Sequence, residues 1–157
     1  MNRCRASPHV AHFVEEFQEA DFTYLVTKYE QGSDLIDYME RRGSARFEEQ
    51  EARGLVEKIA LGLKHIHGLG IVHRDIKFGN ILVSSHRNIK IADFGLSIDL
   101  KTKKSTRKFS GTLSFMAPEV IEGRKSNTKA DIWSLGVILY AMINGNVPFG
   151  SPNHTRF

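Results

Sequence analysis

One stretch of sequence constrains this chain more than any other. His73-Arg74-Asp75-Ile76-Lys77-Phe78-Gly79-Asn80 is followed, thirteen residues after Asn80, by Asp93-Phe94-Gly95. In order, it offers a carboxylate that can receive a hydroxyl proton, a lysine, an amide and a second carboxylate. Amide and carboxylate oxygens are ligands that Mg²⁺ accepts. The pattern therefore predicts a catalytic loop followed by a metal-binding turn.

A third motif, Ala117-Pro118-Glu119, completes the series H-R-D-x-x-x-x-N, D-F-G and A-P-E. On these motifs the chain resembles a eukaryotic-type protein serine/threonine kinase over almost its whole length. The resemblance implies an α+β, protein kinase-like fold that is partial. Residues 10–32 would form two strands of the small lobe and the hinge. Residues 33–157 would form most of the mainly helical large lobe, without its last helices.

The resemblance assigns the chemistry residue by residue. Asp75 would orient the substrate hydroxyl and accept its proton, and Lys77 would neutralise the γ-phosphate of ATP during transfer. Asn80 completes the catalytic set and, with Asp93, would hold Mg²⁺. The resemblance therefore implies ATP and Mg²⁺ as cofactors. The remaining nucleotide-binding residues would be the gatekeeper, three hinge residues, a ribose-binding or substrate-binding aspartate and a leucine under the adenine: Thr27, Lys28, Tyr29, Glu30, Asp34 and Leu82.

The segment between Asp93 and Glu119 resembles an activation segment. Gly111 to Glu119 is similar to the substrate-docking loop of serine/threonine kinases, in which Thr112 would bond near Asp75 and restrict the acceptor to aliphatic hydroxyls of proteins. Arg74 is placed to pair with a phosphorylated residue of this segment. The candidate acceptors in the basic stretch before Gly111 are Ser105 and Thr106, then Ser110.

Other matches are structural. Asp131 resembles a buried helix residue whose carboxylate accepts backbone N–H bonds from the catalytic loop. His73 and Phe94, with Phe13, match apolar residues that stack between the lobes. Glu119 would pair with an arginine. The sequence departs from the family pattern at Phe115, where tyrosine is usual, and at Phe78-Gly79, where Pro-Glu is common.

Hydrophobic periodicity predicts the elements. Strands are expected at 12–17 and 23–29, with Gly32 ending the second and Ser33 and Asp34 starting a helix over 35–39. An apolar stripe at three- and four-residue steps predicts a helix over 48–67. Short strands follow at 71–72, 81–83 and 89–91. The segment 129–144 is apolar nearly all round and predicts a buried helix.

Composition excludes several classes. The net charge of +4 is mild, its basic residues cluster between 101 and 108, and nothing resembles a nucleic-acid-reading module. The longest apolar run, 132–143, is too short to cross ~30 Å of hydrocarbon. The expected partners are ATP and a protein substrate, with no nucleic acid and no membrane. A lone cysteine, Cys4, and no leader indicate a cytoplasmic or nuclear location.

Two functions remain open. No Gly-rich phosphate loop and no strand lysine precede the hinge, so the chain is expected to be a fragment of an ATP-dependent protein kinase that is inactive or very weak alone. The alternative is a non-catalytic kinase-like fragment that binds or regulates a partner. The segment 133–140 resembles calcium/calmodulin- and AMP-activated-type kinases, whereas Lys77-x-Gly79-Asn80 is also similar to polo-like kinases. The subfamily therefore stays open.

Overall fold

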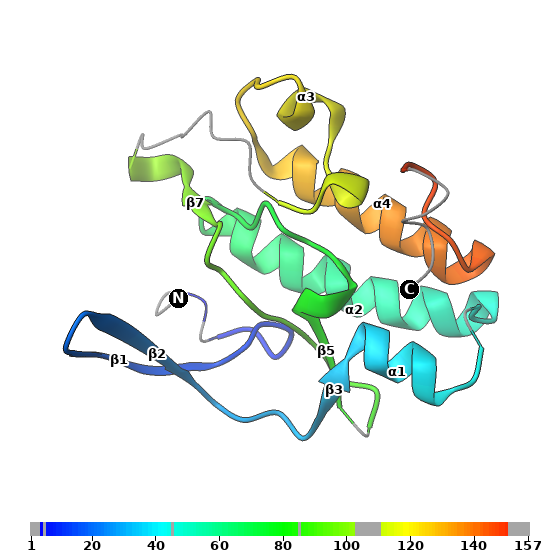
Figure 1. The fold of residues 1–157 in the computed structure, drawn as a ribbon, viewed down its shortest axis with the longest axis horizontal. Helices are drawn as coiled ribbons and strands as arrows, with labels where there is room; N and C mark the ends of the chain where they lie inside the picture. Colours follow the sequence, from blue (N-terminus) through cyan, green and yellow to red (C-terminus); the bar gives the residue numbers. More distant parts are fainter. Residues whose placement is uncertain (1–3, 5, 45, 85, 103–110, 151–157) are drawn as a thin grey trace.

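The computed structural model describes residues 4, 6–44, 46–84, 86–102 and 111–150. A hairpin projects from one end of the molecule, while two long helices and a small sheet form its body (Figure 1). The helices are α1 (Leu35–Arg41), α2 (Glu49–Gly68), α3 (Pro118–Ile121) and α4 (Thr128–Asn144). The strands are β1 (Phe13–Glu19), β2 (Phe22–Thr27), β3 (Gly32–Asp34), β4 (Ile71–Val72), β5 (Ile81–Ser84), β6 (Ile89–Ile91) and β7 (Ile98–Asp99). Short 3₁₀ turns are η2 (Phe78–Asn80), η3 (Leu100–Thr102) and η4 (Leu113–Phe115).

The sequence predicts two strands here, and in the structure these strands, β1 and β2, pair as an antiparallel hairpin. Phe17 pairs with Tyr24 in register, and their rings stack with centroids 5.0 Å apart. Phe22 and Leu25 are more than half exposed. A two-stranded sheet that shows this much apolar surface is marginal in water on its own. The hairpin is therefore an exposed appendage of the described structure.

The hairpin joins the body through the segment before it. Backbone bonds link Ala11 to Ile91 (2.8 Å) and Ile91 to His9 (2.9 Å), so this segment runs alongside β6. Val10 is buried at this contact. The connection places β1, β2 and the residues that follow them next to the β3–β5–β6 sheet.

The prediction that Gly32 ends a strand and that a helix starts directly after it was incomplete. Gly32–Asp34 forms strand β3, which pairs antiparallel with β5 in the sheet order β3-β5-β6. A Cβ on Gly32 would lie 2.1 Å from the carbonyl oxygen of Val83, so only glycine lets the two backbones approach this closely. Asp34 then caps α1 as predicted, since its Oδ1 accepts from Ile36 N (2.8 Å) and Asp37 N (2.9 Å).

Helix α2 confirms the apolar stripe. Leu55, Ile59, Leu63 and Ile66 have at most 2% of their surface exposed. Full burial of such a side chain is worth about 1.5–3 kcal/mol. Gly62 lies where a Cβ would come within 2.8 Å of both the His9 carbonyl oxygen and Ile91, so α2 packs closely on β6 and on the N-terminal segment. This helix is the centre of the core.

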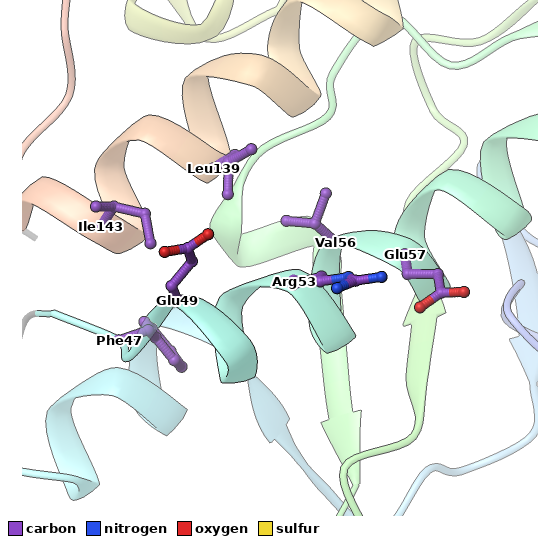
Figure 2. A pocket seen from close by; sticks show the side chains of 7 residues that line it. All are labelled: Phe47, Glu49, Arg53, Val56, Glu57, Leu139 and Ile143. Carbon is purple, nitrogen blue, oxygen red and sulfur yellow. The ribbon is translucent and has the colours of Figure 1, made fainter.

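The prediction that α4 is buried all round was wrong. Ile132, Trp133 and Tyr140 are 51%, 38% and 45% exposed, because the described elements cover only one side of the helix. Its covered side packs on α2 and η4. Between α2 and α4 lies a cavity of about 580 Å³ with apolar and charged walls (Figure 2). Its lining residues are Phe47, Glu49, Arg53, Val56, Glu57, Leu139 and Ile143.

A short pair, β4 with β7, was not predicted from the sequence. Val72 pairs with Ile98, and Leu100 N donates to Gly70 O at 2.8 Å. The pairing ties the chain just after the Asp93-Phe94-Gly95 turn to the strand just before the His73 loop. Among the described helices, none is long and apolar enough to cross a membrane.

Candidate active site

Asp75 is the centre of a compact hydrogen-bond cluster. It is 7% exposed. Its Oδ2 accepts from Lys77 Nζ and from Asn80 Nδ2, each at 2.9 Å. Its Oδ1 accepts from the backbone N (3.0 Å) and the hydroxyl (3.2 Å) of Thr112. The structure therefore brings Asp75, Lys77, Asn80 and Thr112 together, from positions up to 37 residues apart.

These neighbours also set the charge of Asp75. Burial alone would raise the pKa of this carboxyl, but the hydrogen bond and charge of Lys77, with the bonds from Asn80 and Thr112, outweigh burial and lower the pKa below its ordinary value. Asp75 is therefore an ionised acceptor at neutral pH. An ionised carboxylate held in a fixed orientation can receive or orient a hydroxyl proton.

As predicted, the carboxylate of Asp131 accepts hydrogen bonds from the backbone of the catalytic loop. Asp131 is fully buried on α4, and it accepts from His73 N (2.9 Å) and Arg74 N (2.8 Å). A third donor, His67 Nε2 at the end of α2, lies 2.8 Å from its Oδ2. Sequence reasoning missed His67, because a histidine in the last turn of an amphipathic helix gives no signal that it points at a carboxylate on another helix.

His73 is held as one neutral tautomer. Its Nε2 donates to the carbonyl of Ala92 (3.0 Å), and its Nδ1 accepts from Asp75 N (3.3 Å). Burial lowers the pKa of His73, although the carboxylates of Asp131, Asp75 and Asp93 oppose the shift. The ring also contacts Phe94 edge-on, with centroids 4.8 Å apart. His73 thus links the catalytic loop to the Asp93-Phe94-Gly95 turn.

Two residues of the site have left-handed backbone conformations. Arg74 has φ 69° and Asp93 has φ 58°, a region that non-glycine residues rarely occupy. Arg74 is fixed there by Asp131 and by a 2.7 Å bond from its Nε to Leu96 O. Such strain persists only where the surroundings determine the conformation, and it is common at functional sites.

The two predicted metal ligands lie on adjoining segments. Ala92 N donates to Asn80 O at 2.9 Å, and Asp93 follows Ala92 directly. The side-chain Nδ2 of Asn80 donates to the carbonyl oxygen (2.8 Å) and to Oδ2 of Asp75. The side-chain amide oxygen of Asn80 is therefore the atom that suits a hard cation. Asp93 is exposed, and one of its oxygens accepts from Gly95 N. The donor set fits Mg²⁺, an ion that takes one or two protein oxygens and completes its shell with phosphates and water.

The predicted nucleotide residues surround one cavity of about 320 Å³. Its walls come from the end of β2, the hinge, β3 and β5. They include all six residues that the sequence assigned to the nucleotide besides Asp93, namely Thr27, Lys28, Tyr29, Glu30, Asp34 and Leu82. Gly79 lies on the same wall, so the cavity reaches the catalytic loop.

Three predicted residues of the activation segment, Ser105, Thr106 and Ser110, lie outside the described residues. Their assignment as phosphate acceptors stays a prediction. Glu119 is half-buried in the first turn of α3, and its backbone carbonyl accepts from Arg124 N at 2.8 Å. The predicted arginine partner of its carboxylate also stays a prediction.

The two departures from the family pattern contact each other. The rings of Phe78 and Phe115 meet edge to face, with centroids 5.6 Å apart and planes at 86°. Both side chains are buried. The sequence alone gave no reason to pair them, because they lie in different loops. Their contact joins the catalytic loop to the docking loop through η2 and η4.

The fold is that of a protein kinase domain. The family described as the protein kinase domain matches residues 1–157, the whole chain, and the chain belongs to that family. It is similar to the SNF1-related protein kinase catalytic subunit alpha KIN12 of Arabidopsis thaliana, with 39% identity over 93% of this chain. It is also similar to the serine/threonine-protein kinase cds1 of Schizosaccharomyces pombe, with 36% identity over 95% of this chain.

The chain spans only part of each relative. The matched region is 29% of the plant protein and 34% of the yeast protein. The comparisons therefore establish the domain family, and the yeast relative is a serine/threonine-protein kinase by name.

Proposed function

We propose that these residues form the core of an ATP-dependent kinase that transfers the γ-phosphate to serine or threonine hydroxyls of proteins. The observation that carries the proposal is the cluster around Asp75, an ionised carboxylate bonded to Lys77, Asn80 and Thr112. A non-catalytic binding module has no chemical need for this arrangement.

We also propose a cytoplasmic or nuclear location, which the single cysteine favours.

Each residue has one task in this reaction. Asp75 accepts a hydrogen bond from the attacking hydroxyl and takes its proton as the new oxygen–phosphorus bond forms. The bond between the γ-phosphorus and the bridging oxygen of ATP breaks in the same step, and ADP leaves with that oxygen. Lys77, whose ammonium is 2.9 Å from Asp75, offsets negative charge on the transferred group. Thr112 holds the docking loop against Asp75 and restricts the acceptor groups that can reach Asp75 to short aliphatic hydroxyls. Mg²⁺, when bound through Asn80 and Asp93, neutralises charge on the phosphates.

The nucleotide would occupy the 320 Å³ cavity at the hinge. Leu82 supplies an apolar wall for the base, and the hinge backbone supplies polar groups. The Oδ1 atom of Asp34 accepts the two capping hydrogen bonds at the start of α1. Its second carboxylate oxygen would therefore accept from a ribose hydroxyl or a substrate arginine. No G-x-G-x-x-G occurs in the 157 residues. The phosphates would therefore be poorly covered in this chain.

The test has two arms. The full-length encoded protein is assayed with radiolabelled ATP on a mixture of peptides that carry serine, threonine or tyrosine. We expect label on serine and threonine only. Residues 1–157 alone should turn over far below the roughly 1–100 s⁻¹ of kinases. Label on tyrosine, or no label from the full-length protein, would refute the proposed activity. If residues 1–157 alone transfer phosphate at roughly 1–100 s⁻¹ and Asp75→Asn abolishes this turnover, the expected low activity of residues 1–157 is refuted.

A further inference from the structure

A second cavity adjoins the hinge and is not used by the proposed reaction. Its volume is about 440 Å³, within the range of ligand pockets. It shares Lys28 and Glu30 with the nucleotide cavity, but its other walls come from the N-terminal segment at His9 and from the turn between β5 and β6. That turn presents His86 and Asn88.

The charge at this cavity is positive. Lys90 Nζ lies 3.1 Å from Glu30 Oε1, close enough for an ion pair, although that oxygen accepts no well-formed hydrogen bond. This pair is neutral overall. Lys28 is exposed and has no acidic partner among the ion pairs of the described residues. It therefore offers an uncompensated positive charge at the cavity wall.

Two further cations, Lys58 and Arg87, lie near this cavity but not in its lining. Lys58, from α2, donates to the carbonyl oxygen of Arg87 at 2.7 Å, which brings a second ammonium group to the turn. The Arg87 side chain is mostly exposed and lies 3.7 Å from Glu51. The surface around the cavity is therefore suited to a negatively charged ligand.

We propose that this cavity binds a short acidic polypeptide segment, one that presents aspartate or glutamate carboxylates to Lys28 and the β5–β6 turn. A peptide fits the chemistry of the wall better than other anions do. The hydroxyl of Ser84 and the amides of Gln31 and Asn88 suit peptide backbone groups. Among the described residues that line the cavity, none is phenylalanine, tyrosine or tryptophan, so they do not offer the stacking surface on which single-stranded nucleic acids rely.

The cavity is separate from the residues proposed to carry out phosphate transfer, although it shares Lys28 and Glu30 with the nucleotide cavity. None of its lining residues belongs to the Asp75 cluster. Binding of an acidic peptide can therefore be measured whether or not the chain transfers phosphate, and failure of one proposal does not imply failure of the other.

The test uses residues 1–157 and a fluorescein-labelled peptide of eight glutamates, followed by fluorescence anisotropy at low salt. We expect saturable binding that Lys28→Glu weakens at least about tenfold, a change equivalent to 1.4 kcal/mol. Lys125→Glu is the matched control, since Lys125 is also exposed but lies in the loop before α4. It changes the net charge equally and should alter the affinity less than about twofold.

A second variant, His86→Glu, alters the turn itself and keeps the test decisive if Lys28→Glu fails to fold. It should weaken binding in the same direction. Three results would overturn the proposal: no binding up to about 1 mM peptide, equal weakening by Lys28→Glu and Lys125→Glu, or tighter binding of a labelled 20-nucleotide single strand with the same dependence on Lys28.

Discussion

Asp131 and Arg74 are 57 positions apart in the sequence, yet the carboxylate of Asp131 accepts the backbone N–H of Arg74 at 2.8 Å. Arg74 has a left-handed backbone conformation at that point. The bond therefore helps to hold a strained conformation directly before the central carboxylate, Asp75. Through it, the position of Asp75 depends on where α4 packs against α2.

Removal of the Asp131 carboxylate should destabilise the chain strongly. In Asp131→Ala, the buried N–H groups of His73 and Arg74 and the ring of His67 lose their acceptor. Breaking a buried charged network of this kind costs about 3–5 kcal/mol. Urea unfolding followed by circular dichroism measures the loss. The exposed turn residue Asp21 provides the control, because Asp21→Ala should change stability by no more than about 0.5 kcal/mol. Equal, small effects from both would contradict the role of Asp131.

The Phe78–Phe115 contact should carry a measurable coupling. Edge-to-face aromatic pairs contribute about 0.5–1.5 kcal/mol beyond their buried area. In a double-mutant cycle with Phe78→Leu and Phe115→Leu, the two single losses should exceed the loss in the double variant by that amount. Additive losses would mean that the two rings are buried side by side without a specific interaction.

Stability should rise with pH between about 5 and 7. Burial lowers the pKa of His73 in the folded chain, while the unfolded histidine titrates near 6.5. The unfolded state therefore binds more protons in this window, and the stability that is fully present above about pH 6.5 is lost as the pH falls toward the folded pKa. Asp75, whose pKa is also lowered, adds a second loss below about pH 3.9.

Urea unfolding at several pH values tests this directly. His73→Gln removes the titrating group and should flatten the dependence between pH 5 and 7. Greater stability at pH 5 than at pH 7.5, or an unchanged slope in His73→Gln, would show that His73 is not the group responsible.

Much of the fold follows from local patterns. The stripe from Leu55 to Ile66 predicts α2 because only one packing direction buries it. The motif order predicts that Asp75, Lys77 and Asn80 act together, and the structure brings them together. Strand β3 could not be predicted, because Gly32 approaches Val83, a residue of a strand that lies 51 positions later in the chain. Non-local contacts of this kind leave no local signal.

The error at α4 has a different cause. A helix that is apolar all round is expected to be buried. The apolar pattern of a helix shows which side chains favour burial, but it does not show which other elements pack against the helix. Ile132 and Tyr140 are apolar and exposed for that reason. His67 was missed because its partner, Asp131, lies on another helix.

The β1–β2 hairpin should make residues 1–157 prone to self-association. Phe22 and Leu25 are 68% and 56% exposed on a two-stranded sheet. Exposed apolar strands are sites of aggregation. Phe22→Lys with Leu25→Lys should lower the light-scattering mass of the chain at high concentration. Tyr29→Lys, at an aromatic that is 82% exposed outside the hairpin, is the control and should have little effect. Scattering that is unchanged by the hairpin pair would place the self-association elsewhere, such as at α4.

The most direct test of the central claim is phosphate transfer by the full-length encoded protein with and without the Asp75 carboxylate. Asp75→Asn keeps the shape of the side chain and can still accept from Lys77 or Thr112, but it can no longer take a proton. A positioned general base contributes about 10²–10⁴ in rate. We predict that serine and threonine labelling falls by a factor in that range, and circular dichroism at the assay temperature checks that the variant is folded. Labelling at the wild-type rate in Asp75→Asn would contradict the assignment of Asp75 as the residue that receives the hydroxyl proton.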